Sequence, residues 1–182
     1  MEGSDILQTL AEVGIALTGF TGIVVALRGR VGESLSGFAS VRFRILLIAS
    51  LASVGFALQP FFFFHIGLAP DVIWSTCSAI VCLFMVAVSI HDIRAFRTHS
   101  NVIPKLDRQT APLIVMLGSA LWFCQIANVL EIRAFGPYLA APMWFLAFSA
   151  FQFCRLLLEP EENEPSPNPR KLPADHSGRG SS

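Results

Sequence analysis

Apolar residues fall into five runs, each long enough for a helix that crosses a membrane. Such a helix needs about 20 mostly apolar residues to cross roughly 30 Å of hydrocarbon. Charge, glycine or proline bounds each run, as in "GLAPD" between the second and third runs and "RAFGP" between the fourth and fifth. Pro60 and Pro142 lie inside spans, where we expect a kink or a local break. The predicted spans are Ile6–Leu27, Ile45–Ile66, Val72–Ile90, Pro112–Leu130 and Tyr138–Leu158.

The composition also indicates a polytopic membrane protein. The 182 residues are 53% hydrophobic and only 14% charged, with a mean hydropathy of +0.60. A soluble domain is about 25% charged. We therefore predict an all-α bundle of five transmembrane helices over residues 1–158. Residues 159–182 are rich in Pro, Glu, Ser and Gly. Such a segment cannot bury enough apolar surface to offset its ordering entropy, so we expect a disordered cytoplasmic tail.

Basic residues are distributed unevenly between the two sides of the predicted bundle. Four Lys or Arg flank the first connection, four lie in the third, and four close or follow the last span. Thus 12 of the 13 share one side, and only Arg133 lies on the other. The positive-inside rule then predicts an N-out, C-in orientation. The arginines follow the first apolar run instead of preceding it, so we expect no cleavable signal peptide. The expected location is multi-pass, in a bacterial inner (plasma) membrane.

Several polar residues share one depth in the outer half of the predicted bundle. Glu12, Gln59 and Gln125 each lie five to seven residues inside the outer end of their span. At 1.5 Å per residue, this is about 8–10 Å below the outer boundary. We predict that these side chains meet in a polar cluster that binds an ion or a ligand. The cluster comprises Glu12, Gln59, Gln125 and Asn128, with Asp5, His65, Glu131 and Arg133 at its rim.

Glu12 is the residue of this cluster that most needs a partner. A charged side chain at the centre of a membrane helix costs about 2.5–3.5 kcal/mol on insertion scales. We therefore expect Glu12 to face the bundle interior, a water-filled cavity or a neighbouring protomer. In a structural interpretation, a protonated Glu12 donates to Gln59 or Gln125, since interhelical polar pairs contribute about 0.6–2 kcal/mol. In a functional interpretation, it binds an ion or relays a proton. A ligand pocket is the third alternative.

Small residues mark the expected helix contacts. On the first helix they lie on the face opposite Glu12. Such stripes let two backbones approach closely, and packing is their usual meaning. With Glu12 on one side and the stripe on the other, the first helix is expected to contact protein on both sides. This favours a central helix or a homo-oligomer. The packing residues are Gly14, Thr18 and Thr21 on the first helix and Ala49, Ser53 and Ala57 on the second.

Motifs for cofactors, metals and catalysis are absent from the sequence. The cysteines form no CxxC pair and match no zinc spacing, so we interpret them as small apolar side chains. His65 and His91 lie near opposite membrane surfaces and cannot share a haem. No potassium-filter sequence, phosphate-binding loop, HExxH or GxSxG motif occurs. We expect that the protein is not an enzyme and that it binds no metal and no cofactor. The cysteines are Cys77, Cys82, Cys124 and Cys154.

Two classes of function remain. The first is a small oligomeric channel or transporter with an outer-half polar site around Glu12. The second is a non-catalytic membrane subunit or scaffold that assembles with itself or with a larger membrane complex. The matched depth of the polar residues favours the first. The expected partners are the lipid bilayer, further copies of this chain and a possible larger complex. The 13 basic residues balance the 13 acidic ones, which gives no indication of a nucleic-acid partner.

Overall fold

Five long helices account for most of the described chain. The computed structural model describes residues 3–30, 37–99 and 105–158, and these ranges contain helices and turns but no strand. The prediction of an all-α chain is confirmed. The elements are α1 (Ser4–Arg30), α2 (Gly37–His65), α3 (Pro70–His99), α4 (Lys105–Ala127), the π-helix η2 (Asn128–Ile132) and α5 (Phe135–Leu158).

Each of these long helices contains a stretch apolar and long enough to cross a membrane, which confirms the predicted number of spans. The stretches are Ser4–Val24, Phe43–His65, Pro70–His91, Pro112–Ile132 and Phe135–Leu157. The orientation across the membrane stays a prediction. The predicted disordered tail, residues 159–182, lies outside the described residues.

The helices continue beyond the apolar runs that predicted them. α2 begins at Gly37 and not at Ile45, and α3 continues past Ile90 to His99. Hydropathy marks where the chain leaves the hydrocarbon, whereas backbone hydrogen bonding continues as long as the residues tolerate helical geometry. The predicted boundaries therefore describe the apolar part of each helix and not its full length.

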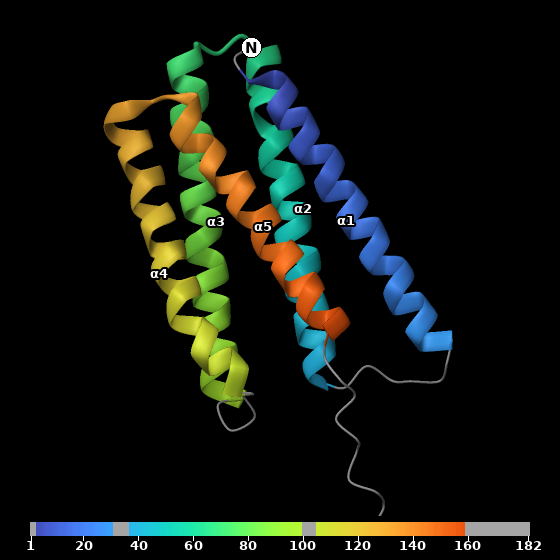
Figure 1. Ribbon diagram of the computed structural model, residues 1–182. Helices are drawn as coiled ribbons and strands as arrows, with labels where there is room; N and C mark the ends of the chain where they lie inside the picture. Colours follow the sequence, from blue (N-terminus) through green and yellow to red (C-terminus); the bar gives the residue numbers. More distant parts are fainter. Residues whose placement is uncertain (1–2, 31–36, 100–104, 159–182) are drawn as a thin grey trace, which may run out of the picture.

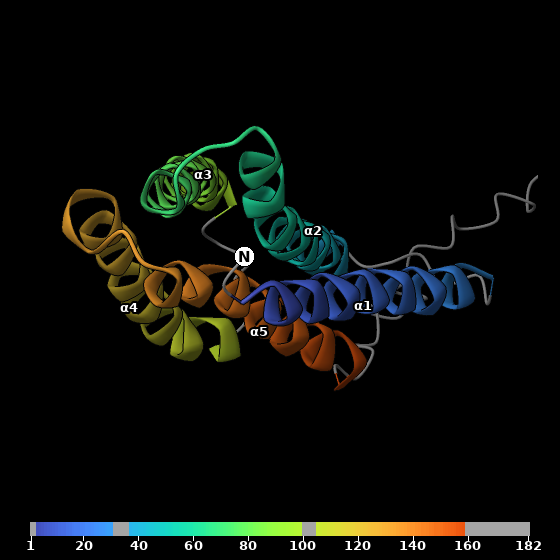
Figure 2. The same cartoon turned by 90° about the horizontal axis from the view of Figure 1, so that it is seen from above.

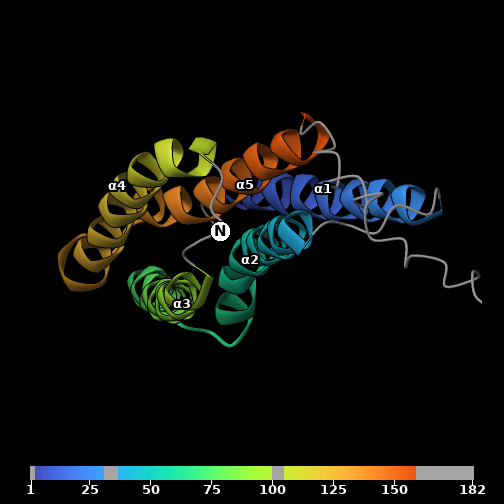
Figure 3. The same ribbon diagram turned by 90° about the horizontal axis from the view of Figure 1, so that it is seen from below.

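Successive helices run in opposite directions, so their junctions fall at two ends of the bundle (Figure 1). The N-terminus, the α2–α3 turn and the η2–α5 junction lie at one end, called the N-terminal end below. Seen along the bundle, α2 and α3 form one layer, while α4, α5 and α1 form the other (Figures 2 and 3). α2 packs most extensively against α5 and α1. Within the described residues, α1 and α4 occupy opposite edges and do not touch each other.

Aromatic rings build the core between α2, α3 and α5. Phe56, Phe84 and Phe145 come from the three helices in turn, and their ring centroids lie 5.3–5.6 Å apart. Trp74 packs beside Tyr138, with 5.7 Å between the ring centroids. Aromatic pairs of this kind contribute about 0.5–1.5 kcal/mol beyond their burial. Lipid tails are as apolar as these rings, so close packing, more than exclusion from water, holds the helices together.

Three of the long helices contain an internal proline, Pro60 in α2, Pro112 in α4 and Pro142 in α5, and each helix continues through it without a break. A proline has no N–H, so Pro60 leaves the carbonyl of Phe56, four residues earlier, without its helical donor. The Tyr138 hydroxyl on α5 donates a hydrogen bond to this carbonyl. Tyr138 and Pro60 are both fully buried, so water cannot take that role. The proline in α2 and the tyrosine in α5 therefore form one structural unit.

Small residues bring α1 and α2 together. Gly14 is buried against α2, and a Cβ atom at this position would lie 2.7 Å from Cγ2 of Val54. The Ser50 hydroxyl donates to the Gly14 carbonyl at 2.8 Å and lies 2.6 Å from the Thr18 hydroxyl. Absence of a side chain at Gly14 thus allows a hydrogen bond between one helix and the backbone of the other.

The other residues expected at helix contacts are also buried. The Thr21 hydroxyl donates a hydrogen bond to the Leu17 carbonyl of its own helix at 2.7 Å. Ser53 faces α5, where it donates to the Pro142 carbonyl at 2.8 Å. Ala49 and Ala57 belong to the apolar core. On α2, Ser53 therefore contacts α5, whereas the neighbouring Ser50 contacts α1.

Candidate functional site

Glu12 lies on the outward face of α1 and not inside the bundle. Its side chain is exposed, and its recorded partner is Gln8 on the same helix, whose Nε2 donates to Oε1 of Glu12 at 3.0 Å. Asp5 and Thr9 are exposed as well. These four polar residues, Asp5, Gln8, Thr9 and Glu12, are called the α1 polar face below. The helical period of 100° per residue sets them opposite Gly14.

The packing of α1 determines this direction. Leu7, Ala11 and Gly14 are buried on the side that faces the bundle. Residues at three- and four-residue spacing share a face, so burying these three turns Glu12 outward. The structure therefore records no hydrogen bond from Glu12 to Gln59 or to Gln125.

Gln125 and Asn128 lie in the interior, each fully buried. Nε2 of Gln125 donates to the Pro137 carbonyl at 2.7 Å, which joins α4 to the start of α5. Nδ2 of Asn128 donates to the Ser78 hydroxyl on α3 at 2.8 Å. Gln59 is partly buried, and its Nε2 has no hydrogen-bond partner within the described residues. The amide donors of Gln125 and Asn128 thus bind the protein's own backbone and hydroxyl groups.

A π-helical turn, η2, ends the fourth span and was not predicted from the sequence. The Arg133 N–H donates to the Asn128 carbonyl, five residues earlier, at 3.1 Å. Oδ1 of Asn128 accepts from the N–H of Ala134 at 2.9 Å, and Ser75 on α3 donates to the Val129 carbonyl at 3.0 Å. A buried asparagine before a glycine-proline junction is the pattern that points to such a cap, since its side chain can replace backbone partners.

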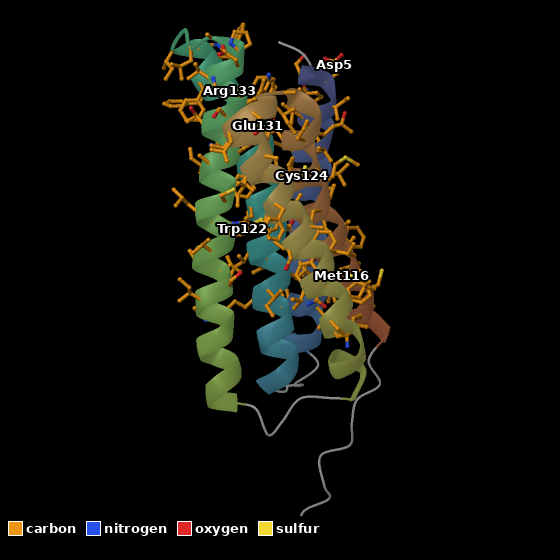
Figure 4. The ribbon with its side chains drawn as sticks, turned by 90° about the vertical axis from the view of Figure 1, so that its left-hand side faces the viewer. Asp5, Met116, Trp122, Cys124, Glu131 and Arg133 are labelled. Atoms are coloured by element: carbon orange, nitrogen blue, oxygen red, sulfur yellow. The ribbon has the colours of Figure 1, made fainter. Side chains whose placement is uncertain are left out.

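Arg133 follows this turn in the left-handed backbone conformation, with φ 49° and ψ 43°. Among the described non-glycine residues it alone has a positive φ. The conformation is costly for residues with a Cβ, by roughly 1–2 kcal/mol. The capped turn maintains it and leaves the guanidinium exposed at the N-terminal end of the bundle (Figure 4).

The residues predicted for the rim lie at the N-terminal end and are exposed. Figure 4 shows Asp5, Glu131 and Arg133 there, with Asp5 on α1, Glu131 in η2 and Arg133 directly after η2. No ion pair within the described residues joins them. His65 ends α2, and its Nδ1 donates to the Phe61 carbonyl at 2.9 Å. The eight predicted residues thus divide into an outward face on α1, interior amides and separate exposed groups.

Metal ligation finds no support in the described part of the chain. No group of three or more His, Cys, Asp or Glu residues there is arranged to hold a metal ion. All four cysteines are free thiols, and Cys77 is fully buried.

The depth of Glu12 along α1 gives its exposed carboxylate a free-energy cost in a membrane. Glu12 lies eight residues inside the Ser4–Val24 stretch, about 12 Å along the helix axis at 1.5 Å per residue. Insertion scales assign about 2.5–3.5 kcal/mol to a charged residue at a helix centre. A second protein surface or a water-filled space beside the α1 polar face removes this cost.

Known proteins do not supply a family for this chain, because no protein-family model, curated protein or solved structure matches it.

Proposed function

We propose that this protein is the protomer of a homo-oligomeric membrane channel or transporter for cations. Glu12 is the site that binds the cation or carries the proton, and the site lies between protomers. The supporting observation is the exposed carboxylate of Glu12 on a membrane-spanning helix. Intramembrane carboxylates often mark ion or proton pathways.

The packed interior favours a path between protomers over one through a single bundle. Interior side-chain donors bind backbone carbonyls or a hydroxyl of a neighbouring helix, as Gln125, Asn128 and Ser53 do. Aromatic rings fill the space between α2, α3 and α5. Exposed carboxylate and hydroxyl oxygens that could replace part of an ion's hydration shell lie on the α1 polar face.

The sign of the charge favours cations. Asp5 and Glu12 lie on one face of α1, and Asp71 and Glu131 are exposed at the same end of the bundle. Carboxylate rings are the usual selectivity device of cation channels. One Glu12 at each contact between protomers would place such a ring of carboxylates in a closed assembly, from a single residue of the chain.

A non-catalytic subunit of a larger membrane complex is the second candidate. One observation favours it: Oε1 of Glu12 already accepts a hydrogen bond from Gln8, so the α1 polar face can dock on a polar helix of another protein without conducting ions.

Cation and proton flux in proteoliposomes tests the proposal, with the full chain as wild type and as Glu12→Gln. The amide keeps the shape and the hydrogen bond to Gln8 but cannot hold a charge or release a proton. We expect flux from the wild type and at least a tenfold loss in Glu12→Gln, roughly 1.4 kcal/mol or more.

The matched control is Asp71→Asn, which removes an exposed carboxylate from the first turn of α3. It should retain flux. Native mass spectrometry in nanodiscs should show the same oligomer for all three chains. Equal flux in Glu12→Gln and the wild type would contradict the role of Glu12. Absence of flux from the wild type, together with co-purification of a different protein, would favour the second candidate.

A further inference from the structure

We propose that copies of this chain join head to tail, with the α1 edge of one copy against the α4–η2 edge of the next. In this contact, Asp5 of one copy faces Arg133 of its neighbour. The contact rests on the homo-oligomer of the proposed function but does not require transport.

The two edges are the parts of the bundle with the fewest partners of their own. α1 and α4 lie at opposite ends of the cross-section and do not touch (Figures 2 and 3). Their spans are the least buried of the five. Each edge also carries exposed apolar side chains, such as Phe20 on α1 and Phe123 on α4. Each copy therefore offers two different edges for contact.

Charge complementarity identifies a second copy as the occupant. Asp5 lies in the first turn of α1, and Arg133 lies at the same end of the bundle beside η2 (Figure 4). In the sequence, the residues before α1 and the two junctions at this end contain one Lys or Arg between them, which is Arg133. Neither side chain makes an ion pair within the described part of its own chain. An exposed cation on one edge thus matches an exposed carboxylate on the other.

The backbone around Arg133 presents this side chain outward. Its left-handed conformation is maintained by the Asn128 cap, which holds both the Arg133 and Ala134 N–H groups. A residue that adopts this conformation against its steric preference is positioned by its surroundings. Glu131 shares this edge, so the charge that can pair with the α1 edge is that of Arg133.

A contact between two α1 edges would not pair Asp5 with Arg133. A two-fold axis would place Asp5 and Glu12 of one copy against the same carboxylates of the other. Like charges in contact oppose association. A contact between two different edges avoids this repulsion and closes into a ring when its rotation permits.

Cysteine cross-linking in membranes distinguishes the two symmetries, using full-length chains with Cys154 changed to serine. We expect a chain that carries both Asp5→Cys and Arg133→Cys to form a ladder of dimers, trimers and larger products on mild oxidation. Either substitution alone should give monomers. Dimers from Asp5→Cys alone, or no ladder from the double variant, would overturn the head-to-tail contact.

Charge reversal provides a second test. Asp5→Arg and Arg133→Asp should each weaken assembly in nanodiscs about fivefold, whereas the double reversal should restore it. Asp71→Arg is the control, because it also reverses a first-turn carboxylate but lies on α3. Single reversals without effect, or a double reversal no better than either single one, would overturn the pairing. A cross-linked ladder without flux would preserve this contact and remove the proposed function.

Discussion

Replacing Tyr138 with phenylalanine tests how α2 tolerates its internal proline. The change removes one hydroxyl and leaves the ring beside Trp74 in place. It deprives the Phe56 carbonyl of a donor that Pro60 cannot supply. A buried group left without a partner costs about 1–3 kcal/mol. We expect a loss of about 2 kcal/mol in the free energy of unfolding, toward the middle of that range.

A double-mutant cycle with Pro60→Ala makes this prediction specific. Alanine restores the N–H that donates to the Phe56 carbonyl within α2. In the Pro60→Ala background, Tyr138→Phe should therefore cost about 1 kcal/mol or less, because the carbonyl keeps a donor. Unfolding would be measured by reversible denaturation in detergent micelles. An equal cost of Tyr138→Phe in both backgrounds would refute the link between the proline and the tyrosine.

Ser53→Ala is the matched control for this cycle. Like Tyr138→Phe, it removes a hydroxyl that donates a hydrogen bond between α2 and α5. The Ser53 hydroxyl donates to the Pro142 carbonyl at 2.8 Å. The Pro142 carbonyl lies inside α5 and keeps its intrahelical donor. The loss should be near the average of about 0.6 kcal/mol for hydrogen bonds between membrane helices. A larger loss than in Tyr138→Phe would mean that acceptor satisfaction does not control the cost.

Two further substitutions test contacts outside this unit, measured by the same unfolding assay. Gly14→Ala should destabilise the bundle by about 1–3 kcal/mol, because its Cβ meets the stiff Val54 side chain, whereas Gly55→Ala has open space and should be neutral or slightly stabilising. Asn128→Ala should cost about 2–3 kcal/mol, because it leaves the Ala134 N–H and the Ser78 hydroxyl without partners. Ser119→Ala, on an exposed site of α4, should remain within about 0.5 kcal/mol. Equal effects within either pair would contradict the assignments.

The spans could be predicted because they depend on a local property of the chain. Twenty consecutive apolar residues specify a membrane helix whatever surrounds them. Continuation of α2 through Pro60 could not be predicted from such a local property. Whether an internal proline breaks a helix depends on what satisfies the freed carbonyl, and here the donor is Tyr138, far away in sequence. That information exists only in the packing of α2 against α5.

The polar cluster shows the same limit at the candidate site. Depth along the membrane follows from residue counting, which predicts that Glu12, Gln59 and Gln125 lie at one level. Direction around the helix axis depends on which face of α1 is buried. The small stripe at Gly14 contained that information, since it set the packing side opposite Glu12. Matching depth without matching direction does not bring side chains together.

The outward direction of Glu12 has a consequence for how the protein acquires any activity. A single protomer buries the polar groups that hold it together and leaves its intramembrane carboxylate on the surface. Folding of one chain therefore leaves this carboxylate without the protein or water surroundings that would lower its free-energy cost, and the proposed association would supply them. Because Asp5 and Glu12 share one face of α1, the proposed assembly contact and the proposed cation site would lie on the same surface. An activity built on this face would exist only in the assembled protein, and loss of assembly would remove it without unfolding the protomer.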